Sequence, residues 1–364
     1  MSRGRIAFFL PSVRGGGAQR VIVNLVQGIV QRGEPVDVVL AMADGVFMDH
    51  LPPEVRVVDL GGRRLIGGFV PLIGYLRRER PRVVVSSMSH ANMLALWASR
   101  LAGRGTPVMV TVHNTMSESG GSDGGLEHRL LRTFYPWATW IVAVSRGAAD
   151  DLARTTGLPR SRIDVVYNPV ITPAIMTAAE REPDHPWLAP GQPPVILGVG
   201  RLTRQKDFLT LVRAFGELRC RRQARLIILG DGEDRPALEA LVAELGLQED
   251  VALPGFRDNA PAYMARSALF VLSSAWEGLP TVLIEALAVG TPVVSTDCRS
   301  GPREILQEGR LGALVPVGDA PALARAMERG LECPDPRLPP DALTVYTLDA
   351  AVDHYLRLIE RAPA

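Results

Sequence analysis

Short apolar runs alternate along the chain with longer segments in which apolar residues recur every three or four positions. The short runs of the first half are rich in β-branched residues and include RIAFFL, VDVVL, RVVVSS, PVMVTV and WIVAV. The longer segments between them, such as AQRVIVNLVQGIV and ANMLALWASRLA, have the spacing of amphipathic helices. Strands separated by helices of this length pair in parallel through right-handed crossovers. The pattern therefore predicts a doubly wound α/β fold for this half.

The alternation stops at residue 169 and starts again near residue 195. The segment 169–194 contains seven prolines spread along its length and no sustained periodicity, which is typical of a connection between domains. We therefore predict two Rossmann-like domains that face each other across a cleft, over 1–168 and 195–346, with a linker over 169–194 between them. A terminal helix over 347–364, apolar along one stripe, is expected to pack back on the N-terminal domain.

Composition limits the classes of function. The chain has 364 residues, of which 47% are hydrophobic, so it can bury a substantial core. Its formal net charge of +1 provides no global basic field for nucleic acid. The 3 cysteines lie far apart and form no Cys-x-x-Cys pair, which argues against disulfides and a zinc site. This cysteine usage fits a reducing compartment, so we expect a cytoplasmic protein.

Two features bear on export and on membrane insertion. The start MSRGRIAFFLPSVRGGG combines basic residues with an apolar run, but Pro11 ends that run early. A first strand is therefore favoured over a signal peptide. No stretch approaches the roughly 18 uninterrupted apolar residues of a membrane-spanning helix, so none is expected.

The loops that follow the predicted strands carry the information about function, because open parallel sheets bind ligands beyond the carboxyl ends of their strands. After the first strand, Gly15, Gly16 and Gly17 lead into a helix whose backbone amides can bind a phosphate. A flexible tight turn is the alternative. After PVMVTV, His113 can hydrogen-bond a polar substrate or transfer a proton. A histidine satisfied by neighbouring backbone is the alternative there.

Two cations follow the first strand of the C-terminal half. Arg201 and Lys206 stand five positions apart in GVGRLTRQKD, at a strand-to-helix turn. Converging cations suit a pyrophosphate, because arginine binds it through a planar fork and lysine as a point charge. Ordinary surface charge is the alternative.

The segment SAWEGLPTVLIEALAVG places two acids eight positions apart. Glu277 and Gly278 follow the strand LFVLSS, where a carboxylate can accept hydrogen bonds from two sugar hydroxyls and a glycine lets backbone approach a ligand. Glu285 lies in the apolar helix that follows, where an unpaired buried carboxylate would be costly. We expect Glu285 to face a bound polyol, and a salt bridge to a nearby arginine is the alternative.

Together these segments resemble the retaining glycosyltransferases of family 4, which have the GT-B fold. The resemblance rests on GGGAQR, VAVSRGAADDL, VVYNPV, GRLTRQKD, LGDGEDRPALEALVAELGL and EGLPTVLIEALAVGTPVVSTD, and it covers nearly the whole chain. Its most specific part is the Glu-x7-Glu element combined with the Arg-x4-Lys element. It implies transfer of a hexose or N-acetylhexosamine from a nucleotide sugar, UDP-linked, to a saccharide or lipid-linked saccharide in surface polysaccharide or glycoconjugate synthesis.

The resemblance implies that the N-terminal domain over 1–168 binds the acceptor and that the C-terminal domain over 195–346 binds the nucleotide sugar. It also implies a role for each candidate residue. Arg201 and Lys206 would hold the donor diphosphate and stabilise its departure, and Glu277 would bond the sugar hydroxyls. His113 matches the histidine that lies next to the donor sugar in the family. The remaining donor-binding positions would be Gly16, Gly17, Gly278, Leu279 and, at the ribose, Glu285.

The resemblance also implies that no metal and no other cofactor is needed. The sequence contains no Asp-x-Asp, which is the signature of the metal-dependent alternative fold. One position departs from the family pattern, because similar proteins often read GGAER where this chain has Gln19 in place of the glutamate. That position lies on the acceptor side in the family, so the identity of the acceptor does not carry over with it.

The segment GGRRLIGGFVPLIGYLRRERPR interleaves arginines with apolar residues and suits the surface of an anionic bilayer. On that interpretation the enzyme attaches peripherally at the inner face of the plasma membrane and its acceptor is a polyprenyl-linked saccharide. The alternative is a loop and a crossover helix with a solvated basic face.

Other functions share parts of the pattern. A GT-B-fold epimerase or hydrolase would bind the nucleotide sugar without an acceptor, and a two-domain sugar-binding protein would normally carry an export signal. A dinucleotide oxidoreductase is suggested by Gly198 and Gly200, but Thr203 stands where the third glycine would be. For transfer with retention, the sequence nominates no carboxylate nucleophile besides Glu277. This favours front-side transfer, in which the departing phosphate takes the acceptor proton.

Overall fold

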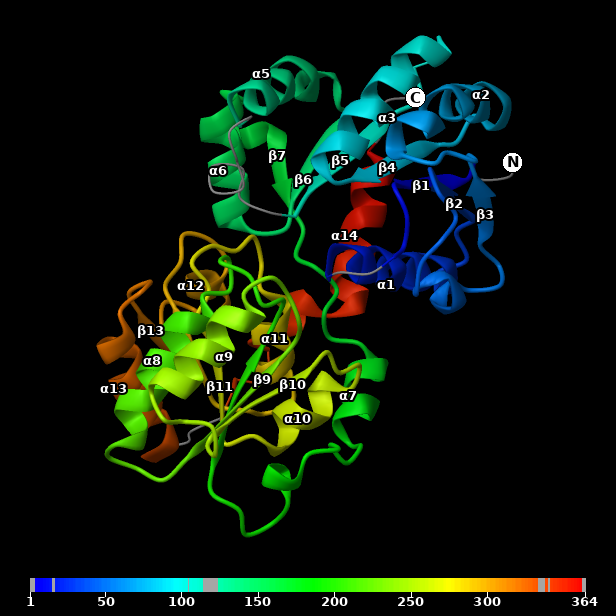
Figure 1. The fold of residues 1–364 in the computed structure, drawn as a ribbon. Coiled ribbons are helices and arrows are strands. Elements are labelled where there is room, and N and C mark those ends of the chain that lie inside the picture. Colours follow the sequence, from blue (N-terminus) through cyan, green and yellow to red (C-terminus); the bar gives the residue numbers. More distant parts are fainter. Residues whose placement is uncertain are drawn as a thin grey trace. The chain divides into compact units, whose positions relative to one another are not determined.

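The chain forms two compact units. Unit 1 comprises Met1–Pro169 and Val345–Ala364, and unit 2 comprises Val170–Thr344. Each unit is a parallel sheet with helices on both faces (Figure 1), so the two doubly wound α/β domains predicted from the sequence are confirmed. The computed structural model describes residues 4–14, 17–103, 105–113, 124–332, 338–339 and 341–361.

The sheet of unit 1, over the described residues, has parallel strands in the order β3-β2-β1-β4-β5-β6-β7. The order reverses at β1, which pairs with both β2 and β4 and so creates the switch point at which doubly wound sheets bind ligands. The strands are β1 (Ile6–Leu10), β2 (Val36–Leu40), β3 (Arg56–Asp59), β4 (Val83–Ser87), β5 (Val108–Val112), β6 (Trp140–Ala143) and β7 (Ile163–Val165).

Helices cover both faces of this sheet, and the alternation of side chains along each strand divides the core between them. Phe9 packs toward the face that α2, α3, α5 and α6 cover, whereas Phe8 packs toward the face that α1 and α14 cover. The helices are α1 (Gly17–Gln31), α2 (Phe69–Glu79), α3 (Ser89–Ala102), α5 (Gly124–Phe134), α6 (Arg146–Thr156) and α14 (Leu348–Glu360). Short 3-10 helices are η1 (Met48–His50), η2 (Leu65–Gly68), η3 (Tyr135–Trp137), η4 (Arg160–Arg162) and η6 (Thr344–Tyr346).

The C-terminal helix α14 packs against α1. Gly28 of α1 allows the close approach, because a Cβ atom there would lie 2.6 Å from Cγ2 of Val352. Arg32 of α1 donates hydrogen bonds to Asp349 at 2.8 Å and to Asp353 at 2.5 Å. The last helix of the chain therefore completes the core of unit 1.

The sheet of unit 2, over the described residues, has parallel strands in the order β10-β9-β8-β11-β12-β13. Its switch point lies at β8, which pairs with β9 and β11. The strands are β8 (Val195–Val199), β9 (Arg225–Leu229), β10 (Val251–Gly255), β11 (Leu269–Leu272), β12 (Val293–Thr296) and β13 (Ala313–Val315). The helices are α7 (Pro173–Ala179), α8 (Phe208–Arg219), α9 (Arg235–Glu244), α10 (Ala260–Arg266), α11 (Thr281–Ala288), α12 (Pro302–Ile305) and α13 (Ala320–Glu332), with the 3-10 helix η5 (Pro186–Leu188).

The proline-rich segment 170–194 belongs to unit 2 and contains regular structure. Pro173 occupies the start of α7 behind the N-cap Thr172, whose side chain accepts a hydrogen bond from the amide of Ile175. Helix α7 packs against α10, and Tyr263 of α10 donates a hydrogen bond to Asp184. The prolines thus begin helical turns that cover unit 2, because proline is preorganised for the first position of a helix.

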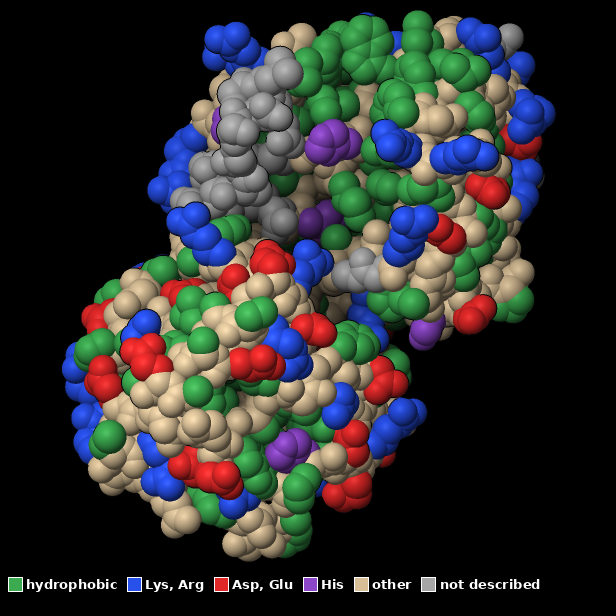
Figure 2. Space-filling view, in the orientation of Figure 1, with side chains coloured by type: hydrophobic (Ala, Val, Ile, Leu, Met, Phe, Trp, Pro, Cys, Tyr) green, Lys and Arg blue, Asp and Glu red, His purple; other side chains and the backbone are tan. Residues whose placement is uncertain are grey.

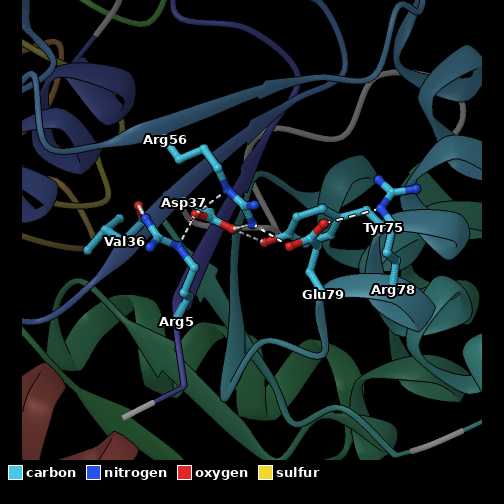
Figure 3. Close-up of polar contacts among 7 residues, drawn as sticks. All are labelled: Arg5, Val36, Asp37, Arg56, Tyr75, Arg78 and Glu79. Carbon is cyan, nitrogen blue, oxygen red and sulfur yellow. Dashed lines mark hydrogen bonds and ion pairs between the residues drawn. The ribbon is translucent and has the colours of Figure 1, made fainter. Parts of the chain in front are cut away.

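A buried carboxylate joins three strands at the amino-terminal edge of the unit 1 sheet. Asp37 of β2 is fully buried and accepts hydrogen bonds from Arg5, Arg56 and the hydroxyl of Tyr75, the last at 2.6 Å (Figure 3). Arg5 precedes β1, Arg56 begins β3 and Tyr75 comes from α2. Arg56 also pairs with Glu79 at 2.8 Å. This edge is therefore tied together by charge, away from the carboxyl edge at which doubly wound sheets bind ligands.

The surroundings of Asp37 keep its carboxylate ionised. Burial alone would raise the pKa of Asp37, but hydrogen bonds from Arg56, Tyr75 and Arg5 outweigh burial and leave the pKa below its ordinary value. A lowered pKa in the folded state contributes stability above the pKa of the unfolded chain. This contribution is lost as the pH falls through the folded-state pKa.

Replacing Asp37 should destabilise unit 1. We expect Asp37→Asn to lower the free energy of unfolding by about 2–3 kcal/mol, because it removes the shared counter-charge of two guanidinium groups that are themselves partly exposed. Tyr75→Phe should cost about 1.5 kcal/mol, the contribution of one hydrogen bond to a charged group. Urea unfolding at neutral pH measures both.

The exposed variant Arg78→Ala is the control and should change the free energy of unfolding by less than about 0.5 kcal/mol. The difference between the wild type and Asp37→Asn should shrink as the pH is lowered through the folded-state pKa of Asp37. An Asp37→Asn protein that unfolds at the wild-type urea concentration would refute this account.

Candidate functional site

In unit 2, two neighbouring strands end at the same edge and their loops are joined by hydrogen bonds. The loop after β8 leads into α8, and the loop after β11 leads into α11. Ser273 Oγ donates to the carbonyl of Lys206 at 2.7 Å, and the amide of Ala275 donates to the carbonyl of Gln205 at 2.8 Å. Gln205 Nε2 donates in turn to the carbonyl of Trp276 at 3.0 Å. The two loops therefore hold each other in one arrangement.

Lys206 and Glu277, one from each loop, form an ion pair. Lys206 Nζ lies 2.5 Å from Glu277 Oε1, and the side chains are 17% and 7% exposed. Ser274 Oγ donates to the same carboxylate oxygen at 2.7 Å. Gln205 Nε2 lies 3.5 Å from the other oxygen. A positive and a negative group thus stand side by side at the carboxyl edge of the sheet, both largely withdrawn from water.

Arg201 lies in the same loop as Lys206, but its guanidinium is exposed. Within the described part of the chain, the Arg201 side chain has no hydrogen-bond or ion-pair partner. Asp207 has a left-handed backbone (φ 45°) and caps α8 through a hydrogen bond from the amide of Thr210 at 3.3 Å. The loop after β8 therefore presents two exposed arginines, Arg201 and Arg204, and one paired cation, Lys206, before a helix whose dipole also favours an anion.

Packing is tight around the glycines of this edge and requires glycine at Gly230. A Cβ atom at Gly198 would lie 3.0 Å from Cε1 of Phe208, and one at Gly200 would lie 3.0 Å from Cε of Lys206. Gly230, after β9, has a φ of +135°, and a Cβ atom there would lie 1.9 Å from the carbonyl oxygen of Gly200.

The loop after β12 fixes the backbone next to Glu277. Ser300 Oγ donates to the carbonyl of Gly278 at 2.9 Å. Gly301 has a φ of +93°, and a Cβ atom there would lie 2.4 Å from Cδ of Pro280. Thr296 Oγ1 donates to the carbonyl of Ser274 at 2.6 Å. Hydrogen bonds and packing from β12 and from the loop after it thus fix the backbone of Gly278 and its neighbours.

The remaining sequence-predicted residues of unit 2 lie close along the chain. Leu279 is buried in the loop between β11 and α11. Glu285 lies within α11 and is 8% exposed, so the structure confirms that this helix buries a carboxylate. That Glu285 binds a ribose stays a prediction, as does the alternative of a salt bridge to an arginine.

In unit 1, His113 directly follows β5 at the carboxyl edge. Burial lowers the pKa of His113 to about 4, so the imidazole is neutral near pH 7. Its Nε2 atom lies 3.2 Å from Thr111 Oγ1, and its buried Nδ1 atom has no hydrogen-bond partner among the described residues.

The hydrogen bonds of Thr111 favour one tautomer of His113. Thr111 Oγ1 lies 3.0 Å from the carbonyl of Ser86, which can only accept, and 2.6 Å from Ser87 Oγ, which can donate. With its single proton on the Ser86 carbonyl, Thr111 Oγ1 accepts from the imidazole. Nε2 of His113 then carries the proton and Nδ1 carries a lone pair. The structure therefore offers a buried acceptor that a substrate hydroxyl can satisfy.

The first loop of unit 1 is described in part. Gly15 and Gly16 lie outside the described residues, as does Asn114 after His113. Gly17 begins α1, and a Cβ atom there would meet nothing within 4 Å, so packing among the described residues does not require glycine at this position. Gln19 is buried within α1. Its role on the acceptor side stays a prediction.

Sequence analysis missed the neutral residues that hold the charged ones. Gln205 and Ser274 contact the Glu277 carboxylate, and Ser300 holds the backbone beside it. Gln205 and Ser274 lie within three residues of a singled-out charge, in a loop at a strand end, which was the available signal, whereas Ser300 has no such neighbour in the sequence. Among the described side chains, no group of three His, Cys, Asp or Glu is placed to hold a metal ion.

Comparison with known proteins defines the class. The family model for Glycosyltransferase Family 4 matches residues 15–172, and the model for Glycosyl transferases group 1 matches residues 180–340. The N-acetylgalactosamine-N,N'-diacetylbacillosaminyl-diphospho-undecaprenol 4-alpha-N-acetylgalactosaminyltransferase of Campylobacter jejuni is 31% identical over 340 residues, which are 90% of each chain. The lipopolysaccharide core biosynthesis glycosyltransferase LpsE of Rhizobium meliloti is 29% identical over 320 residues, 87% of this chain and 86% of the relative.

Solved structures share the fold at lower identity. Anabaena Alr3699/HepE in complex with UDP has a TM-score of 0.77 at 20% identity and covers 98% of this chain and 100% of its own. The apo form of the lipopolysaccharide outer core galactosyltransferase WaaB has a TM-score of 0.75 at 21% identity, over 98% and 99% of the two chains. The protein is thus a two-domain α/β transferase of the GT-B fold. It belongs to the group 1 glycosyltransferases of the family 4 type.

The protonation state of His113 can be measured. We expect its Cε1–H signal in NMR spectra to stay constant from pH 8 down to about pH 5.5, because the neutral form persists to a pKa well below the ordinary value of about 6.5. The signal is assigned by its disappearance in His113→Asn. A titration midpoint near 6.5 would show that the ring is solvated and would remove the argument for a buried acceptor.

Proposed function

We propose that this glycosyltransferase is a retaining enzyme that moves a hexose or N-acetylhexosamine from a UDP-linked donor to a saccharide carried by a polyprenyl lipid. The observation that carries the proposal is the arrangement in unit 2, where the loops after β8 and β11 place two cations and a carboxylate at one edge of the sheet. The HepE structure with bound UDP and the Campylobacter relative, whose name specifies a diphospho-undecaprenol acceptor, support the choice of donor and acceptor.

Each charged group has a distinct part in this proposal. The exposed guanidinium of Arg201 binds the diphosphate through its fork, and the ammonium of Lys206 adds a point charge. Glu277 accepts hydrogen bonds from hydroxyls of the donor sugar, and Glu285 accepts them from the ribose. In unit 1, the Nδ1 lone pair of His113 accepts a hydrogen bond from a sugar hydroxyl. No metal is assigned a part.

The transfer proceeds on one face of the sugar. The bond between the anomeric carbon and the diphosphate oxygen breaks, and the acceptor oxygen forms a new bond to the same carbon from the same side. The acceptor proton passes to the departing phosphate oxygen. Arg201 and Lys206 stabilise the charge that develops on the diphosphate. Glu277 has hydrogen-bonding and ion-pair partners on both loops, which favours a binding part over a nucleophilic one.

A nucleotide-binding experiment tests the proposal. UDP should raise the thermal unfolding midpoint of the wild type without added metal, and GDP, ADP and NAD should do so less, because ligands that bind the folded state stabilise it by mass action. Arg201→Ala should unfold at the wild-type midpoint when unliganded, since its side chain is exposed and unpaired among the described residues. It should lose most of the UDP shift and about 100-fold in turnover.

Arg204→Ala is the matched control, because Arg204 is an exposed arginine of the same loop. It should keep both the UDP shift and the turnover. Glu285→Ala should lose the UDP shift. A shift with NAD alone, or no shift with any nucleotide, would refute the proposed donor. Consumption of the nucleotide sugar at an equal rate with and without acceptor would favour an epimerase or hydrolase.

We further propose that unit 1 contacts an anionic membrane through η2 and α2. Ile66 and Val70 are 68% and 74% exposed, although both are aliphatic. Arg77 lies seven residues after Val70 and so on the same face of the helix. Further exposed arginines of this segment are Arg63, Arg64, Arg78 and Arg80. Glu79, the acid of this segment, is paired with Arg56 and Arg78.

Helix α3 adds apolar surface next to α2. Trp97 and Leu101 are 37% and 47% exposed, and Arg77 of α2 donates to the carbonyl of Leu101 at 2.8 Å. Figure 2 shows hydrophobic side chains gathered over α3 with Lys and Arg side chains beside them. Within the described part of the chain, every helix is too short or too polar to cross a bilayer. We place the proposed contact at the surface of the inner leaflet, in keeping with the proposed polyprenyl-linked acceptor.

Vesicle binding tests this contact. The wild type should sediment with vesicles of phosphatidylglycerol and phosphatidylcholine and should be released by about 0.5 M salt, because surface attraction is screened. The double variants Ile66→Ser with Val70→Ser and Arg77→Gln with Arg78→Gln should each bind several-fold less. Val46→Ser and Arg154→Gln, at exposed sites elsewhere on unit 1, are the matched controls. Equal sedimentation of all variants would remove this surface from the proposal.

A further inference from the structure

The buried ion pair of unit 2 joins two groups to which the proposed function gives different ligands. Lys206 is assigned to the donor diphosphate and Glu277 to the donor sugar, yet Lys206 Nζ and Glu277 Oε1 lie 2.5 Å apart. Neither side chain can withdraw easily. The carboxylate also accepts from Ser274 Oγ at 2.7 Å, and the backbone of Lys206 is held by Ser273 Oγ at 2.7 Å.

A diphosphate that binds Lys206 therefore meets the field of Glu277 as well. The two anions share one ammonium, and the carboxylate is 7% exposed, so water screens their repulsion weakly. A nucleotide sugar offsets this repulsion, because its sugar hydroxyls donate hydrogen bonds to the carboxylate. A free nucleoside diphosphate has no such hydroxyls at that position. Its terminal phosphate also carries additional negative charge near pH 7, since the second pKa of a phosphoryl group is about 6.

We propose that Glu277 is the internal counter-anion of Lys206 and that it selects against the nucleoside diphosphate product. This inference rests on the proposed function, because it takes a nucleoside diphosphate as the leaving group. Glu277 then has a second task besides holding the sugar. It weakens the retention of the product after transfer, so that the next nucleotide sugar can displace it.

The inference predicts that removing a binding residue tightens the binding of one ligand. In Glu277→Gln, the charge of Lys206 is available to the diphosphate alone, and we expect the dissociation constant of UDP to fall about tenfold. The dissociation constant of the nucleotide sugar should stay equal or rise, because the amide accepts sugar hydroxyls less well than the carboxylate. The ratio of the two constants should therefore change by at least tenfold in favour of UDP.

Isothermal titration with UDP and with UDP-glucose, in the presence of a chelator at pH 7.5, measures both constants on the intact protein. Glu239→Gln is the matched control for the change in net charge, because Glu239 is an exposed acid of α9 paired with Arg235. It should leave both dissociation constants within twofold of the wild type. Turnover of Glu277→Gln should be inhibited by UDP at lower concentrations than turnover of the wild type.

Glu277→Gln should also unfold at a lower temperature when unliganded, because Lys206 keeps a largely buried charge without its partner. UDP should then raise its midpoint by more than it raises the wild-type midpoint. If this variant does not fold, Glu277→Asp takes its place, since it keeps the charge but draws it back from Lys206 by one methylene. It should shift the ratio of dissociation constants in the same direction by a smaller factor.

The outcomes separate this inference from the proposed function. A wild type that binds no nucleoside diphosphate would overturn the proposed donor and, with it, the inference. A wild type that binds UDP, together with Glu277 variants that bind UDP no more tightly, would overturn the inference alone and leave Glu277 with its part at the sugar.

Discussion

The ion pair between Lys206 and Glu277 is the contact on which the candidate site depends. Two neighbouring parallel strands end at the same edge, so their loops meet, and each loop contributes one charge. A largely buried charge is tolerable only beside its counter-charge. Each residue therefore requires the other, and the hydrogen bonds of Ser273, Ser274 and Gln205 keep both in place. The two groups proposed to bind phosphate and sugar cannot vary independently in such an arrangement.

The two edges of the unit 1 sheet show opposite uses of buried polar groups. At the amino-terminal edge, Asp37 has all its partners and ties three strands together. At the carboxyl edge, His113 keeps an Nδ1 atom without a partner among the described residues. A satisfied group stabilises the fold, whereas an unsatisfied acceptor costs free energy until a ligand supplies the missing donor. The stabilising carboxylate and the histidine proposed to bind a substrate thus lie at opposite edges of one sheet, Asp37 on β2 and His113 after β5.

The sequence predicted the architecture well, because strands that are buried on both faces consist of continuous runs of apolar residues. It also singled out Lys206 and Glu277, because charged residues after such runs stand at the ligand-binding edge. It did not single out Gln205, Ser274 or Ser300. Neutral polar residues in loops have no periodicity, and their partners come from other strands. The prolines of 169–194 suggested only an irregular connection between domains, although Pro173 begins a helix that packs against α10 of unit 2.

By itself, the sequence determined the order of strands and helices, because that order depends on local periodicity. It also determined which charged residues follow the strands at the carboxyl edge, because parallel strands all end at the same edge. Only the tertiary structure decided which of those charges meet. The pairing of Lys206 with Glu277 depends on β8 and β11 being neighbours although they are separated along the chain. The protonation of His113 likewise depends on its burial and on Thr111. Such contacts arise from packing between distant segments, which no local pattern records.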